Sequence, residues 1–447
     1  MKSHKQKKIY FSFLEASQYH INGGILLMGI VLLALIVANS AFSQAYTEFW
    51  TQKVYLQIGE FNLFNHHGEA MTLMAFINDV LMTIFFFSVG LEIKREVMVG
   101  ELCSFSKALL PIIAACGGMI VPVIIYYFFT SGTEAESGLA IPMATDIAFS
   151  LGVLSLFGRR VPISLKIFLT AFAVVDDIGG ILVIALFYSS HLDTSYLLYA
   201  LGILFVLLMG NKMRVYNKWF YLCIGTVLWY CFLQSGIHAT IAGVIAAFTV
   251  PASPHYKTGK YINHIKESIK YFPISQPKEL ILNKIQINIL KGIESASDRV
   301  ISPLQSLEDN MHGLVDYIVL PLFAFANAGI VLNLGDGQME MSNLPIAIAS
   351  GLVVGKFVGI YLFTWLAIKL RLSSLSEGMT WSNLTGISLL GGIGFTVSLF
   401  IANLSFGENI ALLEQAKLGV LGGTLIAGVL GYIVLHLTLP KKADISA

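Results

Sequence analysis

The chain has 447 residues, of which 56% are hydrophobic and only 12% are Asp, Glu, Lys or Arg, and its formal net charge is +1. A soluble domain carries about 25% charged residues, so this composition excludes a soluble or disordered protein and predicts one surrounded mostly by lipid. The near-neutral charge gives no basic field for phosphate contacts, and no nucleic-acid partner is expected.

Membrane-spanning helices are expected throughout the chain, because a span needs about 20 mostly apolar residues. Residues 1–447 are interpreted as a single transmembrane transporter domain of the all-α, polytopic class. Its polar first 20 residues are expected to be a retained tail rather than a signal peptide. In chain order, the twelve predicted spans are 22–42, 71–92, 108–129, 138–157, 167–188, 195–210, 217–234, 236–251, 314–332, 344–368, 384–403 and 412–438.

The distribution of Lys and Arg predicts the orientation. If the N-terminus is cytoplasmic, 25 of the 28 basic residues fall on the cytoplasmic side, and two, Lys53 and Lys417, fall outside. This asymmetry agrees with the positive-inside rule and predicts an even number of spans with both termini cytoplasmic. The remaining basic residue, Lys356, falls within a span.

Two segments outside the spans have patterns of their own. Residues 54–64 place β-forming residues around Gly59-Glu60 and form either a small hairpin or an ordinary loop. Because a lone hairpin is marginally stable, a hairpin there is expected to pair with another subunit. Residues 252–312 are polar and charged, and the helix-like spacing of 278–301 indicates either a surface helix or a tether.

Four ionisable residues fall near the bilayer midplane: Asp146, Asp176, Asp177 and Lys356. Each costs about 2.5–3.5 kcal/mol at the centre of a membrane helix. A packing contact explains one Asp–Lys pair, but Lys356 neutralises a single carboxylate and leaves two over. The adjacent Asp176 and Asp177 repel each other when both are ionised, which is typical of a site that holds a small cation or protons.

Helix geometry limits how the two adjacent carboxylates are used. Neighbouring helical residues point about 100° apart, so Asp176 and Asp177 either border one wide cavity or face a cavity and a partner helix separately. The second arrangement suits an ion pair between Lys356 and one of the two. Gly179-Gly180 follow directly and allow another helix to approach closely.

Two spans have features that interrupt a helix. Pro142 lies four residues before Asp146 and removes a backbone hydrogen bond, and the segment SLLGGIGFTVSLF contains Gly391, Gly392 and Gly394. Interrupted spans in the two halves of a chain indicate an inverted-repeat transporter with a site at the midplane. Tight helix packing is the alternative explanation of the glycines.

Several segments together resemble the NhaA family of bacterial sodium/proton antiporters, in the family's order and over most of the chain. A departure from the family is the loop 252–312, which is longer than expected. The resembling segments are GLEIKRE at 90–96, PMATDIAFSLG at 142–152, AVVDDIGG at 173–180, SGIHATIAG at 235–243, LPLFAFANAG at 320–329, the Gly-Lys pair at 355–356 and GGIGFTVSLFI at 391–401.

The resemblance implies twelve helices, the fourth and eleventh unwound where they cross, and inverted repeats over about 108–188 and 344–438. Asp177 and Asp176 match the family's cation and proton site, and would be the Na⁺ ligands. Lys356 matches the lysine that pairs with the first aspartate of that motif, here Asp176. Asp146 and Lys356 also match the charges that compensate half-helix ends at the crossing, and Thr145 matches their polar neighbour.

The resemblance also implies regulation and assembly. The outside segment 54–64 matches the family's dimer contact, so a homodimer is expected. Taken alone, GLEIKRE is an ordinary positive-inside anchor and His238 an ordinary hydrogen-bonded packing group. The residues that match the family's pH response are Glu92, Glu96, His238 and Glu308.

These observations predict a secondary active, electrogenic, pH-regulated antiporter of a bacterial inner membrane, which exports Na⁺ or Li⁺ in exchange for inward protons. No cofactor and no enzymatic activity are expected, since no phosphate-binding loop is present. The alternative is a sodium-coupled solute carrier, which requires an organic-substrate site. A channel would conduct Na⁺ without proton coupling, and a membrane aspartyl protease would need a Gly-x-Gly-Asp context that Asp176 and Asp177 lack.

Overall fold

The structure is a computed structural model that describes residues 23–58, 61–62, 64–66, 69–188, 192–254, 258–273, 281, 283–330 and 342–440. The predicted N-terminal tail, the Gly59-Glu60 turn and the basic pair Lys441-Lys442 lie outside the described residues.

The chain divides into two compact units. Unit 1 comprises Met1–Met82, Glu101–Ser189 and Val315–Ala447, and unit 2 comprises Thr83–Gly100 and Ser190–Leu314. Both predicted repeats, 108–188 and 344–438, fall in unit 1, and the loop 252–312 falls in unit 2. That the chain is one transporter domain stays a prediction.

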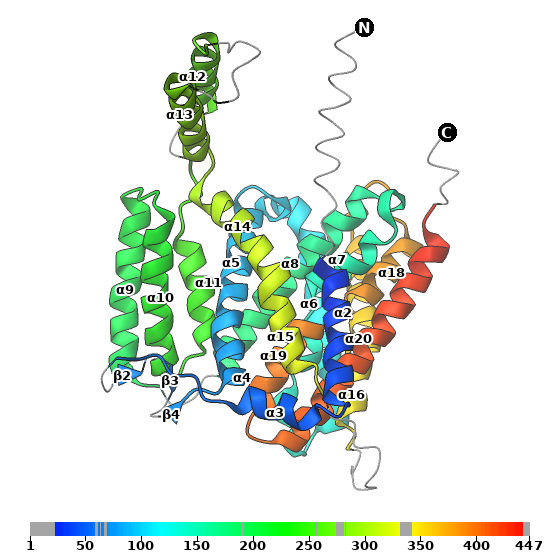
Figure 1. Ribbon diagram of the computed structural model, residues 1–447. Coiled ribbons are helices and arrows are strands. Elements are labelled where there is room, and N and C mark those ends of the chain that lie inside the picture. The colour runs from blue at the N-terminus through cyan, green and yellow to red at the C-terminus, as the bar shows by residue number, and fades with distance from the viewer. Residues whose placement is uncertain are drawn as a thin grey trace. The chain divides into compact units, whose positions relative to one another are not determined.

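Unit 1 is built almost entirely from helices (Figure 1). Short π-helical turns at Ile77–Leu81, Val315–Val319 and Gly351–Gly355 join some of them into longer helices. Its helices are α2 (Gly23–Ala38), α3 (Ser43–Thr51), α4 (Leu73–Phe76), α6 (Phe105–Thr130), α7 (Ile147–Ser155), α8 (Ile163–Phe187), α15 (Leu320–Asn327), α16 (Leu344–Ser350), α17 (Lys356–Lys369), α18 (Trp381–Leu390), α19 (Phe395–Phe406) and α20 (Ile410–Thr438).

Unit 2 contains most of one long helix from the first half of the chain and six helices from its middle. Its helices are α5 (Met82–Met98, which begins at the last residue of unit 1), α9 (Thr194–Lys212), α10 (Lys218–Ser235), α11 (Ala239–Thr249), α12 (Thr258–Lys270), α13 (Lys284–Val300) and α14 (Pro303–Leu314).

The structure confirms a membrane protein but not the full number of spans. Among the described residues, six helices are long and apolar enough to cross a bilayer, and three bent helix pairs raise the number to nine at most. Twelve crossings therefore stay a prediction. The six helices are Leu73–Met98, Phe105–Thr130, Ile163–Phe187, Thr194–Lys212, Leu344–Lys369 and Ile410–Thr438.

The first predicted span, 22–42, is too long. Helix α2 ends at Ala38, and the chain turns by 109° into α3. The Asn39 side chain donates a hydrogen bond to Leu35 O at 2.9 Å, and the Ser40 hydroxyl donates to Val37 O at 2.8 Å. The backbone N–H groups of Asn39 and Ser40 donate to the same two carbonyls at 3.2 Å, so these polar side chains add second hydrogen bonds at the last turn of the helix.

Both spans predicted to be interrupted are broken. The segment Glu134–Met143 is bent by 44° against α7, and α18 is bent by 41° against α19. A long helix precedes and follows each break: α6 and α8 in the first half, and the continuous Leu344–Lys369 and α20 in the second. The same order of elements, a long helix, a broken helix and a second long helix, therefore occurs twice in unit 1.

The predicted hairpin segment contains only very short strands. β1 (Gln57–Ile58) pairs antiparallel with β2 (Phe61–Asn62), and β3 (Asn65–His66) pairs antiparallel with β4 (Glu69–Ala70). The β1–β2 ladder lies within 54–64, on either side of Gly59-Glu60, and the β3–β4 ladder follows this segment; each strand has only two residues, so a stable hairpin stays a prediction. Whether this segment forms a contact between subunits stays a prediction.

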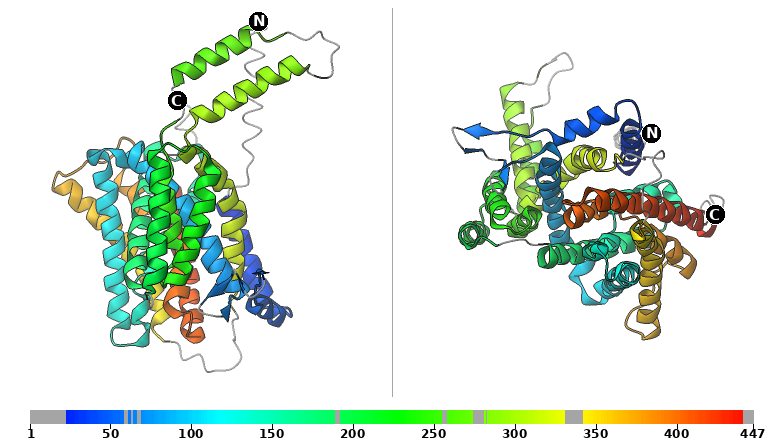
Figure 2. Two further views of the ribbon diagram at one scale, coloured as in Figure 1. Left: turned by 90° about the vertical axis from the view of Figure 1, so that its left-hand side faces the viewer. Right: turned by 90° about the horizontal axis from the view of Figure 1, so that it is seen from below.

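The loop 252–312 contains more helix than expected. The predicted helix 278–301 corresponds to α13, and α12 was not predicted separately; the two lie side by side (Figures 1 and 2). Helix α13 begins with a reciprocal cap, in which Asn283 Oδ1 accepts from Gln286 N at 2.9 Å and Gln286 Oε1 accepts from Asn283 N at 2.8 Å. This arrangement satisfies two N–H groups that have no partner within the helix.

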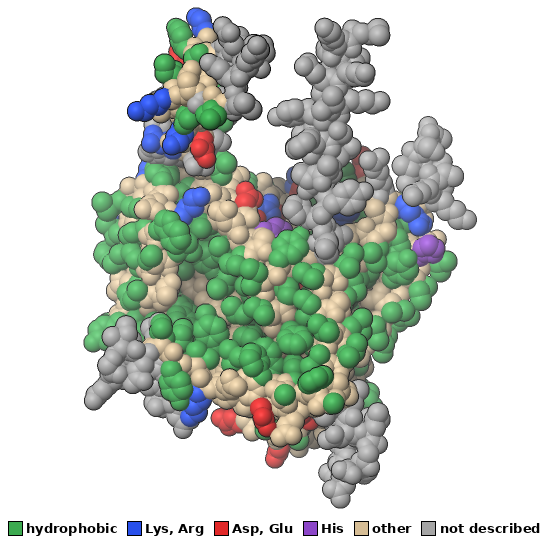
Figure 3. Space-filling model, in the orientation of Figure 1, with side chains coloured by type: hydrophobic (Ala, Val, Ile, Leu, Met, Phe, Trp, Pro, Cys, Tyr) green, Lys and Arg blue, Asp and Glu red, His purple; other side chains and the backbone are tan. Residues whose placement is uncertain are grey.

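The outer helices of unit 1 present apolar side chains, as lipid-facing helices do. Leu33 and Ile36 of α2 and Leu425 and Leu437 of α20 are all at least half exposed. Hydrophobic side chains accordingly cover the faces of these two helices that are visible in Figure 3. Such surfaces would be unfavourable in water and are expected in a bilayer.

Helices α6 and α17 cross at a pair of glycines. A Cβ atom built on Gly117 would overlap Gly359 O, and one built on Gly359 would overlap Gly117 O. The absence of both side chains lets the two backbones touch, which is how small residues strengthen helix packing in membranes. This crossing joins the first long helix of one predicted repeat to that of the other.

We expect Gly359→Ala to lower the free energy of unfolding by about 1–3 kcal/mol, because the added methyl group forces two backbones apart. The measurement is the thermal unfolding midpoint of the purified protein in detergent. Gly29→Ala is the matched control, since a Cβ there has no atom within 4 Å. Equal midpoints for the two variants would show that the crossing is looser than the structure indicates.

Candidate functional site

The two broken helices of unit 1 meet at their breaks. Residues 144–146 separate the Ile141–Met143 turn from α7, and residues 391–394 separate α18 from α19. The backbone N–H of Asp146 donates to Ile393 O at 2.6 Å. The two non-helical segments therefore satisfy part of each other's backbone, as they must at membrane depth.

The Asp146 carboxylate caps two helices at once. Its Oδ1 accepts from Phe149 N at 2.9 Å, in the first turn of α7. Its Oδ2 accepts from Thr396 N at 3.1 Å and from the Thr396 hydroxyl at 2.7 Å, in the first turn of α19. One buried negative charge thus faces the positive N-terminal ends of two half-helices, at the crossing where the sequence placed Asp146.

Hydroxyl groups satisfy the carbonyl ends of the same breaks. Thr145 Oγ1 donates to Gly391 O at 2.8 Å, and Ser150 Oγ donates to Leu390 O at 3.0 Å, both at the end of α18. Ser398 Oγ donates to Ile141 O at 2.7 Å. The sequence analysis identified Thr145 but missed Ser150, Thr396 and Ser398. Each of these three is a hydroxyl residue in the first helical turn after a break, and that position could have indicated them.

Lys356 and Asp176 form a buried ion pair. Lys356 Nζ lies 2.6 Å from Asp176 Oδ2, and both side chains are fully buried. The ammonium also lies 5.5 Å from the centre of the Phe172 ring, one turn before Asp176 on α8. The bond of Lys356 goes to Asp176 rather than to a half-helix end, so its expected second role at the crossing has no contact here to support it.

The second carboxylate oxygen of Asp176, Oδ1, has different surroundings from the Oδ2 atom that Lys356 contacts. Thr145 lies beside this carboxylate, yet none of the described residues gives the buried Oδ1 atom a hydrogen bond of good geometry. Asp177, the next residue on α8, is also buried, at 7% exposure. The structure therefore gathers Thr145, Asp176 and Lys356 in one place, with Asp177 about 100° further round the helix.

The charges of this group do not cancel. Among the described residues, no three or more His, Cys, Asp or Glu side chains form a group that could hold a metal ion. Two neighbouring carboxylates and one ammonium carry a net charge of −1 when all are ionised. One proton or one Na⁺ neutralises that charge, and either ion relieves the cost of burying it.

The residues expected to act in the pH response lie in unit 2, and three of them gather around one arginine. Arg95 Nη1 lies 2.8 Å from Glu96 Oε1, and Arg95 Nε lies 2.6 Å from Glu308 Oε1. Glu92 is close enough to interact electrostatically with all three. A surface hollow of about 400 Å³ lies here, lined by Arg95, Ile301, Gln305, Glu308 and Asp309.

His238 lies at the start of a different helix of unit 2. It precedes the first residue of α11, and its Nδ1 lies 3.2 Å from the Thr240 hydroxyl. Its half-buried ring is therefore a hydrogen-bonded group at a helix N-terminus, and its role in a pH response stays a prediction.

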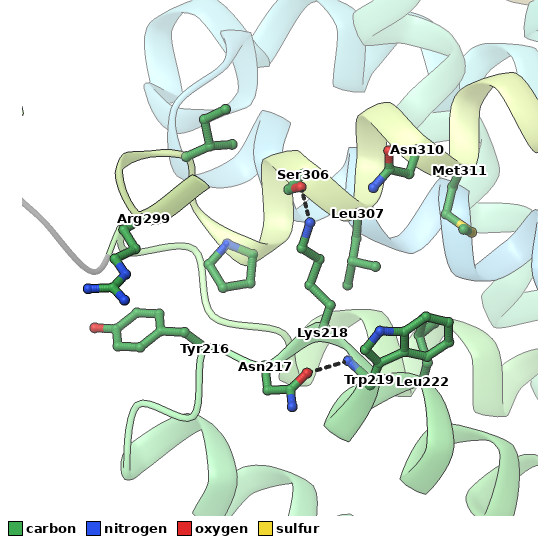
Figure 4. A pocket seen from close by; sticks show the side chains of 12 residues that line it. Tyr216, Asn217, Lys218, Trp219, Leu222, Arg299, Ser306, Leu307, Asn310 and Met311 are labelled. Atoms are coloured by element: carbon green, nitrogen blue, oxygen red, sulfur yellow. Dashed lines mark hydrogen bonds between the residues drawn. The ribbon is translucent and has the colours of Figure 1, made fainter. Parts of the chain in front are cut away.

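A larger cavity of unit 2 is a poor site for a cation. It has a volume of about 690 Å³, and Lys218 reaches across it to donate a hydrogen bond to the Ser306 hydroxyl (Figure 4). Its lining includes Lys218 and Arg299 but neither Asp nor Glu. Two positive side chains without a carboxylate would repel Na⁺.

The sequence also missed a chain of three amides in unit 1. Asn327 Nδ2 donates to Asn78 Oδ1 at 2.9 Å, and Asn403 Nδ2 donates to Asn327 Oδ1 at 2.8 Å. The amides connect α19, which follows the break, to α15 and to the π-helical turn Ile77–Leu81. Asn78 and Asn327 are 249 residues apart in sequence, so no local pattern indicated their hydrogen bond.

The known proteins and the family model that match this chain agree in their descriptions. A family model described as Na+/H+ antiporter 1 matches residues 15–435. A protein of Phocaeicola vulgatus named Na(+)/H(+) antiporter NhaA is 67% identical over 442 residues, which cover 99% of each chain. Proteins with the same name are 60% identical in Bacteroides thetaiotaomicron, covering 95% of this chain and 97% of that one, and 47% identical in Porphyromonas gingivalis, covering 94% of each.

Replacing Asp146 by Ala is expected to destabilise the protein more than removing an ordinary helix cap, because it exposes two helix N-termini to a buried environment at once. A single cap contributes about 0.5–2 kcal/mol. The matched control is Asp193→Ala, which removes an exposed cap whose carboxylate accepts from Ser195 N. Thermal unfolding midpoints decide the prediction, and a midpoint for Asp146→Ala at or above that of the control would contradict it.

Proposed function

This chain belongs to the Na+/H+ antiporter 1 family and is a sodium/proton antiporter of a membrane, and we propose that Asp176 and Asp177 are where the two ions compete. The observation that carries the proposal is the buried Asp176–Lys356 pair with a second buried carboxylate adjoining it. The family consists of transporters, so the chemistry of this site is ion exchange rather than catalysis.

Charge balance supports exclusive binding of one ion or the other. With Asp176 held by Lys356, the two ionised carboxylates and the ammonium still sum to one negative charge, and Asp177 supplies the second carboxylate. Na⁺ binds that charge together with oxygens of the neighbouring backbone and of Asp176, and protonation of the carboxylates removes the attraction. Lithium, with the same charge and a smaller radius, is expected to follow the same route. The two ions exclude each other because both are taken up by the same carboxylates.

The crossing supplies a pivot for alternating access. Hydrogen bonds from both repeats converge on residues 144–146 and 391–394. Half-helices that are broken here can tilt without exposing unsatisfied backbone to lipid, because side chains already satisfy their ends. We infer inverted repeats over about 108–188 and 344–438, with rocking of this bundle opening the site to each side in turn.

We further propose that exchange is electrogenic, with two protons entering for each Na⁺ that leaves. The two carboxylates supply the two proton sites. Each cycle then moves one net charge, and the membrane potential contributes about 2.3 kcal/mol per 100 mV. We place the protein in a bacterial inner membrane with both termini in the cytoplasm, on the basis of the Lys and Arg distribution.

We propose that unit 2 supplies the pH response. We also propose that segment 54–64, in unit 1, forms the contact between two subunits. Arg95 holds Glu96 and Glu308 in an ion-pair cluster beside the hollow, and protonation of these carboxylates would release the arginine. The edges of β-strands pair readily with a second chain, and the short strands β1 to β4 lie in and directly after segment 54–64, which supports a homodimer.

Asp177→Asn is expected to abolish Na⁺-driven proton movement, because an amide neither takes up a proton nor offers a negative charge to Na⁺. The measurement is Na⁺-induced dequenching of a pH-sensitive dye in inverted vesicles, with no organic solute present. Asp193→Asn makes the same chemical change at an exposed helix cap and serves as the control. An undiminished signal in Asp177→Asn would remove this residue from the mechanism.

Glu308→Gln is expected to change the pH dependence of exchange while leaving its maximal rate within about twofold. The substitution breaks one of the two ion pairs of Arg95 but touches neither intramembrane carboxylate. The same dye assay, repeated across a pH series, gives the pH of half-maximal activity. Glu101→Gln is the control, since its ion pair with Lys107 is long, at 3.6 Å, and exposed. A pH profile identical to wild type would exclude Glu308 from the response.

A further inference from the structure

The two helices of the long loop in unit 2 leave large apolar side chains uncovered. Helices α12 and α13 lie against each other (Figure 2), but only Gln286 and Ala296 of the pair are buried among the described side chains. The large hydrophobic residues that remain exposed on these helices and beside them are Ile262, Ile269, Tyr271, Ile281, Ile285, Ile287 and Leu290.

Each helix combines an apolar stripe with a lysine on the same side. On α12, Ile262 and Ile269 are seven residues apart, and Lys266 lies between them. On α13, Ile287 and Leu290 are three residues apart, and Lys291 follows. Residues three, four or seven apart share one side of a helix. Lysines within such a stripe lay their methylene stems along the apolar side chains and carry their ammonium groups out to the headgroups, which suits a helix that lies in a membrane surface.

The exposed charge of the pair is predominantly positive. Its described exposed side chains include five basic residues and only two acidic ones, Glu267 and Glu294. The Lys270 ammonium also lies 5.7 Å from the centre of the Tyr271 ring, so a cation and an aromatic ring adjoin at the end of α12. The five basic residues are Lys266, Lys270, Lys284, Lys291 and Arg299.

The length of the connecting segments keeps this pair close to the membrane. Only residues 301 and 302 separate α13 from α14, which continues into the apolar α15. Residues 250–257 separate α11 from α12, and eight residues span at most about 28 Å. The Lys and Arg distribution places this loop on the cytoplasmic side, where the leaflet is negatively charged.

From these observations we propose that α12 and α13 form a lipid-binding hairpin, which docks on the anionic surface of the bilayer that holds the chain. The isoleucine and leucine side chains enter the interfacial region, and the lysines contact anionic headgroups. Charge favours lipid over a second copy of the hairpin, since two copies would bring positive surfaces together. An anionic leaflet complements the same charge.

The test is made on the full-length protein in nanodiscs that contain one protomer, after the four native cysteines have been replaced. A polarity-sensitive fluorophore is attached to Ile269→Cys on the apolar stripe, or to Asn263→Cys, an exposed neutral position about 120° away round α12. Na⁺-driven proton flux of the labelled proteins in vesicles shows that each variant is folded.

In nanodiscs with about one third phosphatidylglycerol, the fluorophore at position 269 is expected to shift to the blue and brighten at least twofold relative to phosphatidylcholine alone. The fluorophore at 263 should change less. Lys266→Glu combined with Lys291→Glu should remove the difference between lipids, while Lys369→Glu, at an exposed end of α17, should not.

Equal emission in the two lipids at position 269 would overturn the proposal. So would equal shifts at both labelled positions, or a shift that requires two protomers per nanodisc and not anionic lipid, which would identify a second copy as the occupant. Loss of proton flux in the ion-site variants leaves this test unaffected, because binding of the hairpin is read from fluorescence and not from transport.

Discussion

A single carboxylate, that of Asp146, holds the centre of unit 1 together. It accepts hydrogen bonds from the first turns of α7 and α19, two helices that begin in the interior of the protein because the spans that contain them are broken. Breaking a helix at membrane depth leaves unpaired N–H and C=O groups, and each would cost several kcal/mol in lipid. Asp146 satisfies the N–H ends, and the hydroxyls of Thr145, Ser150 and Ser398 satisfy the carbonyl ends.

The same requirement supports the proposal that ions are exchanged here. A protein that has already organised polar groups at the midplane can hold two more carboxylates and a lysine near them. The ion pair of Asp176 with Lys356 offsets the cost of burying both, and in our proposal a proton or Na⁺ balances the net negative charge of the group. The tight crossing of α6 and α17 at Gly117 and Gly359 brings the two proposed repeats into contact beside this site.

Much of the candidate site was readable from the sequence, and the misses have a common cause. Asp146, Asp176, Asp177 and Lys356 stood out because charged residues are rare in apolar spans. Serine and threonine occur throughout membrane helices, so nothing marked Thr396 or Ser398 in advance. The three amides that bond to one another lie in segments far apart in the sequence, so the sequence did not indicate their contacts. In unit 2, the helical spacing predicted α13 but not α12, and charge alone did not show that Arg95 joins Glu96 to Glu308.

The sequence by itself determined the class of protein, the approximate places of its apolar helices, the two spans that break and the charged residues that enter the membrane. These follow from local properties: apolar length, the helical repeat, proline and glycine, and the cost of an isolated charge. Apart from the Lys356–Asp176 pair, which the family resemblance implied, only the tertiary structure decided which partners meet. Thr396 reaches Asp146 across 250 residues of chain, and Lys356 reaches Asp176 across 180. Such pairings depend on how helices cross in space, and no local pattern encodes that.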